Sequence, residues 1–272
     1  MINILEILKF IIIGIVQGIT EILPISSSGH LALTYDILKI NATNQLDITI
    51  YLHLASSIAL LFFFKDTLIK LIKGFCLYIF KKDKRYLSEF KLMLFLVISS
   101  IPVAIVGFLL KPIVESFFQN IVFVSIGFLI TAALLLIMSK MNTSSNNTYT
   151  FKNTAITGLV QCASIFPGIS RSGITLFGSK IAKMSQRNGK EYTFLLLIPI
   201  SFGSSLLAIF DTDFSNQITN NTIYLYLLAM IVAFIFTFLS LKYFFNANLT
   251  KHYKKYAFYL LFLGLFTFIM YI

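Results

Sequence analysis

Apolar runs about as long as a bilayer-crossing helix, which needs roughly 20 residues, recur along the chain and are separated by short polar links. They predict about six transmembrane helices, at residues 49–64 (short for a span), 92–110, 121–139, 192–210, 222–241 and 256–272. The basic region 65–91 follows the first run. Its middle, residues 68–80, has the pattern of an amphipathic helix that lies at the membrane interface.

Two further apolar stretches, at about residues 10–38 and 154–182, are broken in the middle by proline and serine. Pro24 marks the first break and Pro167 the second. Hydrocarbon penalises ionisable side chains and unpaired backbone groups, so a plain spanning helix would carry neither these breaks nor the charges beside them. Each stretch is therefore predicted to be a re-entrant helix–loop–helix hairpin. The alternative for the first is a kinked helix whose glutamate reaches the membrane surface.

The two broken stretches are related to each other. With a shift of 144 residues, 158–173 aligns with 14–29, and seven of the sixteen positions are identical, where composition alone gives about one. A weaker match, at a shift of 148, relates Ser56 and Ser57 to Ser204 and Ser205. The chain is thus predicted to be one all-α integral-membrane domain, residues 1–272, made of inverted repeats at about 1–140 and 152–272.

Composition supports a polytopic helical membrane protein, with 57% hydrophobic and 12% charged residues and a mean hydropathy of +0.86. The net charge of +11 could indicate nucleic-acid binding, but in a membrane chain it more often marks cytoplasmic loops. If three spans follow each hairpin, the links on one side hold eighteen of the 22 Lys and Arg. This bias predicts a multi-pass protein of the plasma membrane with both termini outside and no nucleic-acid partner.

One helical face of the first broken stretch carries Gly14, Gln17, Gly18 and Glu21, which are spaced three and four residues apart. The two glycines are expected to let another helix approach closely. Glu21 is a lone carboxylate deep in an apolar segment, and such a group is functional by default. Gln17 is either an interhelix hydrogen-bond partner or a residue of the same site.

Hydroxyl groups and an imidazole follow the first break. Ser26 and Ser28 are expected to cap the returning half-helix, whose free N–H groups also suit an anion. Ser27 and His30 lie three residues apart and share a face, and a hydroxyl beside an imidazole is the minimal arrangement of an activated nucleophile. His53, in an apolar run, is interpreted as a satisfied polar contact rather than a ligand.

The second broken stretch supplies a guanidinium instead. Arg171 stands at the start of the half-helix after the break, where its fork of donors adds to the positive helix end and suits phosphate. The alternative is that Arg171 is only a structural partner of Glu21. Ser170, Ser172 and Thr175 are expected to add donors. These groups predict a pocket for a phosphorylated lipid.

Two motifs carry a resemblance to a known family: residues 17–30 read QGITEILPISSSGH, and residues 167–175 read PGISRSGIT. They resemble the undecaprenyl-diphosphate phosphatase family, also called bacitracin-resistance proteins. The resemblance implies a membrane hydrolase that releases phosphate from a polyprenyl diphosphate and recycles the carrier lipid for cell-wall synthesis. It also implies a homodimer. Catalysis is assigned to Glu21, Ser27, His30 and Arg171, and substrate binding to Gln17, Ser26, Ser28, Ser170, Ser172 and Thr175.

This chain departs from the family pattern at Gln17, where the family often has glutamate. The departure weakens any scheme in which two carboxylates hold a metal, so whether a divalent cation (Mg²⁺ or Ca²⁺) takes part stays open. We expect Ser27 to attack the terminal phosphorus while His30 or Glu21 accepts its proton. Direct attack by water, with Glu21 as base, fits almost as well. The competing class is a transporter or flippase for an anionic or polyprenyl-phosphate lipid, since broken helices are common there.

Overall fold

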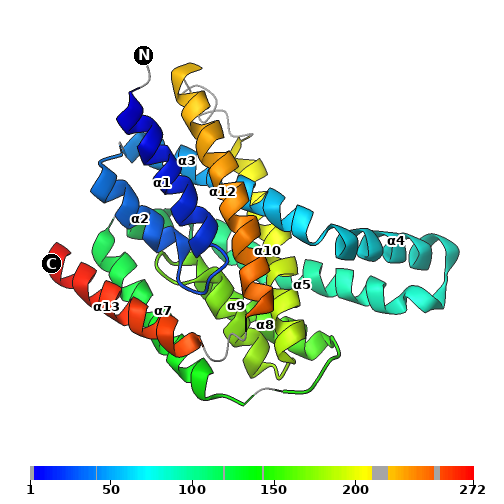
Figure 1. Ribbon diagram of the computed structural model, residues 1–272. Coiled ribbons are helices and arrows are strands. Elements are labelled where there is room, and N and C mark those ends of the chain that lie inside the picture. Colours follow the sequence, from blue (N-terminus) through cyan, green and yellow to red (C-terminus); the bar gives the residue numbers. More distant parts are fainter. Residues whose placement is uncertain (1–2, 41, 119, 143, 210–219, 248–251) are drawn as a thin grey trace.

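The computed structural model describes residues 3–40, 42–118, 120–142, 144–209, 220–247 and 252–272. Within these ranges the chain is helical and forms no strand, apart from one isolated bridge between Ser144 and Ser185. The helices are α1 (Ile4–Thr20), α2 (Ser27–Leu38), α3 (Ala42–Phe63), α4 (Lys65–Lys81), α5 (Leu87–Leu109), α6 (Lys111–Phe118), α7 (Ile121–Lys140), α8 (Phe151–Gln161), α9 (Arg171–Ile181), α10 (Gln186–Ile209), α12 (Asn220–Asn246) and α13 (Tyr253–Tyr271) (Figure 1).

Four helical segments of the described residues are long and apolar enough to cross a bilayer: Lys84–Leu109, Ile121–Lys140, Ile223–Asn246 and Tyr253–Tyr271. A fifth crossing is possible if α3 and α4, which meet at an angle of 75°, count as one bent span. The fold is therefore that of a polytopic α-helical membrane protein. The run expected at 192–210 falls in α10, as far as the structure describes it. α10 is not among the four segments that are long and apolar enough to cross a bilayer. Six crossings therefore stay a prediction.

In both broken stretches the helix is interrupted close to the proline, as the sequence predicts. Pro24 lies in the turn between α1 and α2, and Pro167 lies between α8 and α9. Proline has no N–H to continue a helical ladder, so the chain turns there. Each returning helix is then capped by a serine, since the Oγ atoms of Ser26 and Ser170 accept from the backbone N–H three residues on, at 3.3 and 3.1 Å. The predicted helix–loop–helix arrangement is confirmed.

Glycines bring the first helix of each hairpin into backbone contact with another helix. A Cβ added to Gly14 of α1 would lie 2.6 Å from the carbonyl oxygen of Ala229 in α12, and Gly18 packs against the same helix. A Cβ added to Gly158 of α8 would lie 2.7 Å from the carbonyl oxygen of Ser99 in α5. The expectation of a close helix approach at Gly14 and Gly18 is confirmed. Each hairpin packs on a long helix from the other half of the sequence.

The α4 helix and the N-terminal part of α5 form an antiparallel arm beside the main bundle (Figure 1). Gly74 of α4 packs against Glu89 of α5, whose carboxylate lies 3.4 Å from the ammonium group of Lys70. The amphipathic stretch predicted at 68–80 falls within α4, as expected. Several large apolar side chains on its outer face are exposed, namely those of Ile69, Ile72, Ile79 and Phe80.

Gly127 lets α7 pack directly on the second break. A Cβ added there would lie 2.2 Å from the carbonyl oxygen of Pro167 and 2.6 Å from the Cα of Gly168, whose φ is +80°. We expect Gly127→Ala to lower the thermal unfolding midpoint in detergent, because overpacking against rigid backbone costs about 1–3 kcal/mol or more. Gly203→Ala is the matched control, since its Cβ would meet nothing within 4 Å. Equal midpoints for the two variants would contradict this packing.

Candidate active site

The two breaks meet near the middle of the molecule, where Figure 1 shows the turn after α1 beside α8 and α9. The Ser172 hydroxyl of the second hairpin donates to the carbonyl oxygen of Leu23 in the first turn, at 3.1 Å. A Cβ added to Gly173 would lie 3.4 Å from the Cβ of Pro24. Segments about 150 residues apart in sequence thus form one junction, and the candidate residues surround it.

The turn between α1 and α2 brings the Ser27 hydroxyl to the Glu21 carboxylate. The Ser27 hydroxyl donates to Oε2 of Glu21 at 2.5 Å, and the Gln17 amide donates to the same oxygen at 3.2 Å. Glu21 ends α1 and is buried, whereas Ser27 begins α2 and is partly exposed. The turn folds Ser27 back toward the carboxylate, so that its proton points at a base.

Arg171 enters the site from the second hairpin. One guanidinium nitrogen, Nη1, donates to the Ser201 hydroxyl of α10 at 2.5 Å. The ion pairs of the described residues include none between the Arg171 guanidinium and the Glu21 carboxylate. The alternative of a direct Arg171–Glu21 salt bridge is therefore not seen. Most of the guanidinium donors have no partner in the described part of the chain and can meet an anion.

The contacts of His30 are made with groups other than Glu21 and Ser27. Its Nδ1 is 2.7 Å from the carbonyl oxygen of Ser26, which can only accept, so Nδ1 carries a proton. In the neutral ring Nε2 then accepts from the Tyr259 hydroxyl of α13, also at 2.7 Å. The ring stacks on Tyr259 and meets the edge of Phe128. Both ring nitrogens are thus engaged away from Ser27, so this geometry favours Glu21 over His30 as the base.

The remaining predicted donors line the two breaks in matching pairs. The hydroxyl oxygens of Ser26 and Ser28 lie 3.3 Å apart, and those of Ser170 and Ser172 also lie 3.3 Å apart. Thr175 donates to the carbonyl oxygen of Arg171, at 2.8 Å, within its own helix. Ser26 and Ser170 have the capping role described above. Their predicted contact with substrate stays a prediction.

His53 of α3 is the site residue that sequence reasoning did not place here. Its Nδ1 lies 3.5 Å from Oε2 of Glu21 and 3.3 Å from the Gln17 amide nitrogen. The same amide lies 3.2 Å from the Ser56 hydroxyl, one turn further along α3. The sequence held one indication of this role for His53. The 148-residue shift that aligns Ser56 with Ser204 also aligns His53 with Ser201, the partner of Arg171.

The site offers few side chains that could bind a metal ion. No group of three or more His, Cys, Asp or Glu that could hold a metal ion occurs in the described residues. Glu21 and His53 would supply two ligands. A divalent ion would then need phosphate oxygens and water to complete its shell, which is how Mg²⁺ often binds at phosphate sites. The residues therefore fit a substrate-borne cation better than a cage of protein ligands.

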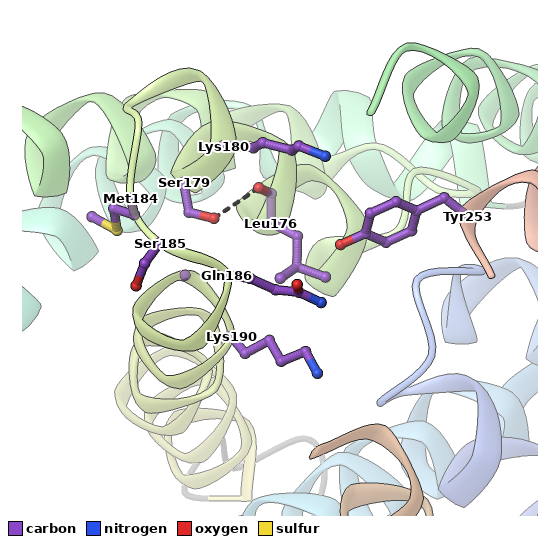
Figure 2. A pocket seen from close by; sticks show the side chains of 9 residues that line it. Leu176, Ser179, Lys180, Met184, Ser185, Gln186, Lys190 and Tyr253 are labelled. Carbon is purple, nitrogen blue, oxygen red and sulfur yellow. Dashed lines mark hydrogen bonds between the residues drawn. The ribbon is translucent and has the colours of Figure 1, made fainter. Parts of the chain in front are cut away.

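A separate pocket at the far end of α9 does not belong to this site. Figure 2 shows the side chains of Lys180, Lys190 and Tyr253 around it. Lys180 donates to the carbonyl oxygen of Met138 at the end of α7, and Lys190 donates to two carbonyl oxygens at the end of α12. Cations at helix C-termini satisfy free carbonyls and the helix dipole, which accounts for both lysines.

Comparison with known proteins gives a consistent picture. The family described as bacitracin resistance protein BacA matches residues 10–266. Undecaprenyl-diphosphatase 1 of Bacillus cereus is 36% identical over 265 residues, which cover 97% of each chain. The undecaprenyl-diphosphatase of Thermosipho melanesiensis is 38% identical over 261 residues, 96% of this chain and 98% of that protein. The similarity thus includes both hairpins and the long helices.

Proposed function

The chain belongs to the bacitracin resistance protein BacA family, and on that basis we propose that it is an undecaprenyl-diphosphatase. It hydrolyses undecaprenyl diphosphate to undecaprenyl phosphate and inorganic phosphate in the membrane. This returns the carrier lipid to cell-envelope synthesis and confers bacitracin resistance. The observation that carries the proposal is near full-length identity of 34–38% with proteins of that name.

The geometry supports a two-step mechanism at the junction of the hairpins. Ser27 Oγ attacks the terminal phosphorus, its proton passes to Glu21, and the bond to the bridging oxygen breaks to release undecaprenyl phosphate. Glu21 passes that proton to the departing undecaprenyl phosphate. Water then attacks the phosphoserine, Glu21 accepts the proton of the water and returns it to Ser27 Oγ as the serine–phosphorus bond breaks, and inorganic phosphate leaves. The Arg171 guanidinium and the N-terminal N–H groups of α2 and α9 stabilise charge on the phosphoryl oxygens, the main source of catalysis in phosphoryl transfer.

The two halves are proposed to be inverted repeats that enter from opposite membrane faces. Reciprocal packing supports this, because α1 packs on α12 as α8 packs on α5. The serine caps and the spacing of their hydroxyl pairs also match. With the basic links in the cytoplasm, both termini lie outside the plasma membrane. Labelling of a cysteine added at the C-terminus, from outside intact cells, tests the orientation, and the mass of the protein in detergent tests the predicted homodimer.

Phosphate release by the purified protein in detergent tests the proposed activity. Undecaprenyl diphosphate is supplied in mixed micelles, where no compartment exists and transport cannot be observed. We expect release of one inorganic phosphate per lipid, and measurement with and without a chelator settles the part played by a divalent cation. A transporter or flippase would release no phosphate under these conditions and would move lipid only in vesicles.

Ser201→Ala is expected to lower kcat by about tenfold, because a hydrogen bond to a charged group is worth about 1.5–3 kcal/mol and this one aims the Arg171 guanidinium. Ser201→Thr keeps the hydroxyl and should retain most of the activity. Ser204→Ala serves as the control, since among the described residues its hydroxyl bonds only to the carbonyl of Ser201, within α10. Similar kcat values for Ser201→Ala and Ser204→Ala would show that Ser201 does not act through Arg171.

A further inference from the structure

Groups from three helices surround one oxygen of the Glu21 carboxylate. Oε2 accepts from the Ser27 hydroxyl of α2 and from the Gln17 amide of α1, and Nδ1 of His53 in α3 lies 3.5 Å from it. Glu21 itself stands at the end of α1, next to the turn, where no following helical residue restrains it. A base in this position would lose its alignment with the nucleophile unless its side chain were fixed from outside the turn.

The donors and acceptors around His53 favour one tautomer of its ring. The Gln17 amide has two protons and three neighbours: Glu21 Oε2 at 3.2 Å, Ser56 Oγ at 3.2 Å and His53 Nδ1 at 3.3 Å. A bare Nδ1 lone pair beside a carboxylate oxygen would be repelled by it. The tautomer with its proton on Nδ1 instead directs that proton toward Glu21 Oε2, 3.5 Å away, and leaves the amide protons for Glu21 and Ser56. Ser56 in turn hydrogen-bonds to Thr237 of α12, at 3.1 Å, which ties this cluster to a second helix.

We propose that His53 is a positioning residue of the reaction: it holds the Glu21 carboxylate against the Ser27 hydroxyl. The inference rests on the proposed function and adds to it a residue outside both sequence motifs. The second half of the chain offers a parallel, because Ser201 of α10 holds Arg171 at the position that the 148-residue shift aligns with His53. In each half, the helix that follows the hairpin fixes the charged side chain that the hairpin carries.

The test compares two substitutions of similar size that place an amide nitrogen differently. In His53→Asn the amide can take the place of Nδ1, whereas in His53→Gln it reaches the place of Nε2. We expect His53→Asn to keep kcat within about fivefold of the wild type. His53→Gln and His53→Ala should lower kcat by about 10²-fold, the scale expected when a reacting group is misplaced by about 1 Å. KM should change little in all three, because a residue that acts only through Glu21 alters the chemical step rather than lipid binding.

A control on the same helix separates positioning from folding. Ser57→Ala removes a buried hydroxyl whose one bond in the described part of the chain is to the His53 carbonyl within α3, and it should leave kcat unchanged. Thermal unfolding midpoints of all variants are measured in the same detergent. Equal kcat for His53→Asn and His53→Gln, or near-normal kcat for His53→Ala, would overturn the inference. If the wild type releases no phosphate, the proposed function fails instead, while activity that needs Ser27 but not His53 refutes only the positioning role.

Discussion

Replacing Ser27 with alanine is expected to lower kcat for phosphate release by at least ~10³-fold, the scale of losing a catalytic nucleophile. The reason is geometric as well as chemical. Ser27 is partly exposed, its proton already points at Glu21 at 2.5 Å, and it is the first residue of α2. Among the described serines beside the first turn, Ser26 and Ser28 hydrogen-bond to each other, whereas Ser27 bonds to the Glu21 carboxylate.

Ser28→Ala is the matched control for that prediction. The Ser28 hydroxyl is one residue further along and lies 3.3 Å from that of Ser26, with no contact to Glu21. Losing it should cost about tenfold or less, the scale of one neutral hydrogen bond. If water attacks the phosphorus directly and Ser27 only binds substrate, Ser27→Ala would behave like Ser28→Ala. Activity is compared at saturating lipid so that kcat and KM are resolved.

Arg171→Ala should lower kcat by at least ~10²-fold, because removal of one preorganised transition-state donor has that effect. The guanidinium is held by Ser201 on one side, and Arg171 stands at the N-terminus of α9. It supplies the positive charge that the transferred phosphoryl group needs as its oxygens gain charge. Arg171→Lys keeps the charge without the planar fork and should recover only part of the loss.

Two controls make the Arg171 result decisive. The unfolding midpoints of both Arg171 variants are compared with that of the wild type, because the guanidinium also contacts α10. Lys180→Ala removes a cation further along the same helix that bonds to Met138 in α7, and it should affect stability more than turnover. Near-normal kcat in Arg171→Ala would refute a transition-state role and would leave the guanidinium a structural one.

The hairpins could be predicted from sequence because their signals are local. Proline ends a helix, serine caps the next one, and the duplicated motif placed both breaks. Gly14 and Gly18 likewise indicated a close helix contact. These features depend on a few neighbouring residues, so tertiary packing changes them little.

Contacts between elements were harder to predict. Helical spacing placed Ser27 and His30 on one face, but Ser27 is the first residue of α2 and bonds back across the turn, while His30 bonds to Tyr259 of α13. His53 stands in an apolar run without a motif, and its place beside Glu21 depends on how α3 packs. Such pairings are set by tertiary packing, which periodicity along one helix does not encode.

The most direct test of the account is to trap the phosphorylated enzyme. Purified protein is mixed with undecaprenyl diphosphate radiolabelled in its terminal phosphate, quenched in acid within one turnover, digested and examined by mass spectrometry. The account predicts a phosphoserine at Ser27 in the wild type, and none in Ser27→Ala. Turnover at the normal rate with no phosphate on Ser27 at any quench time would contradict it and would assign the attack to water.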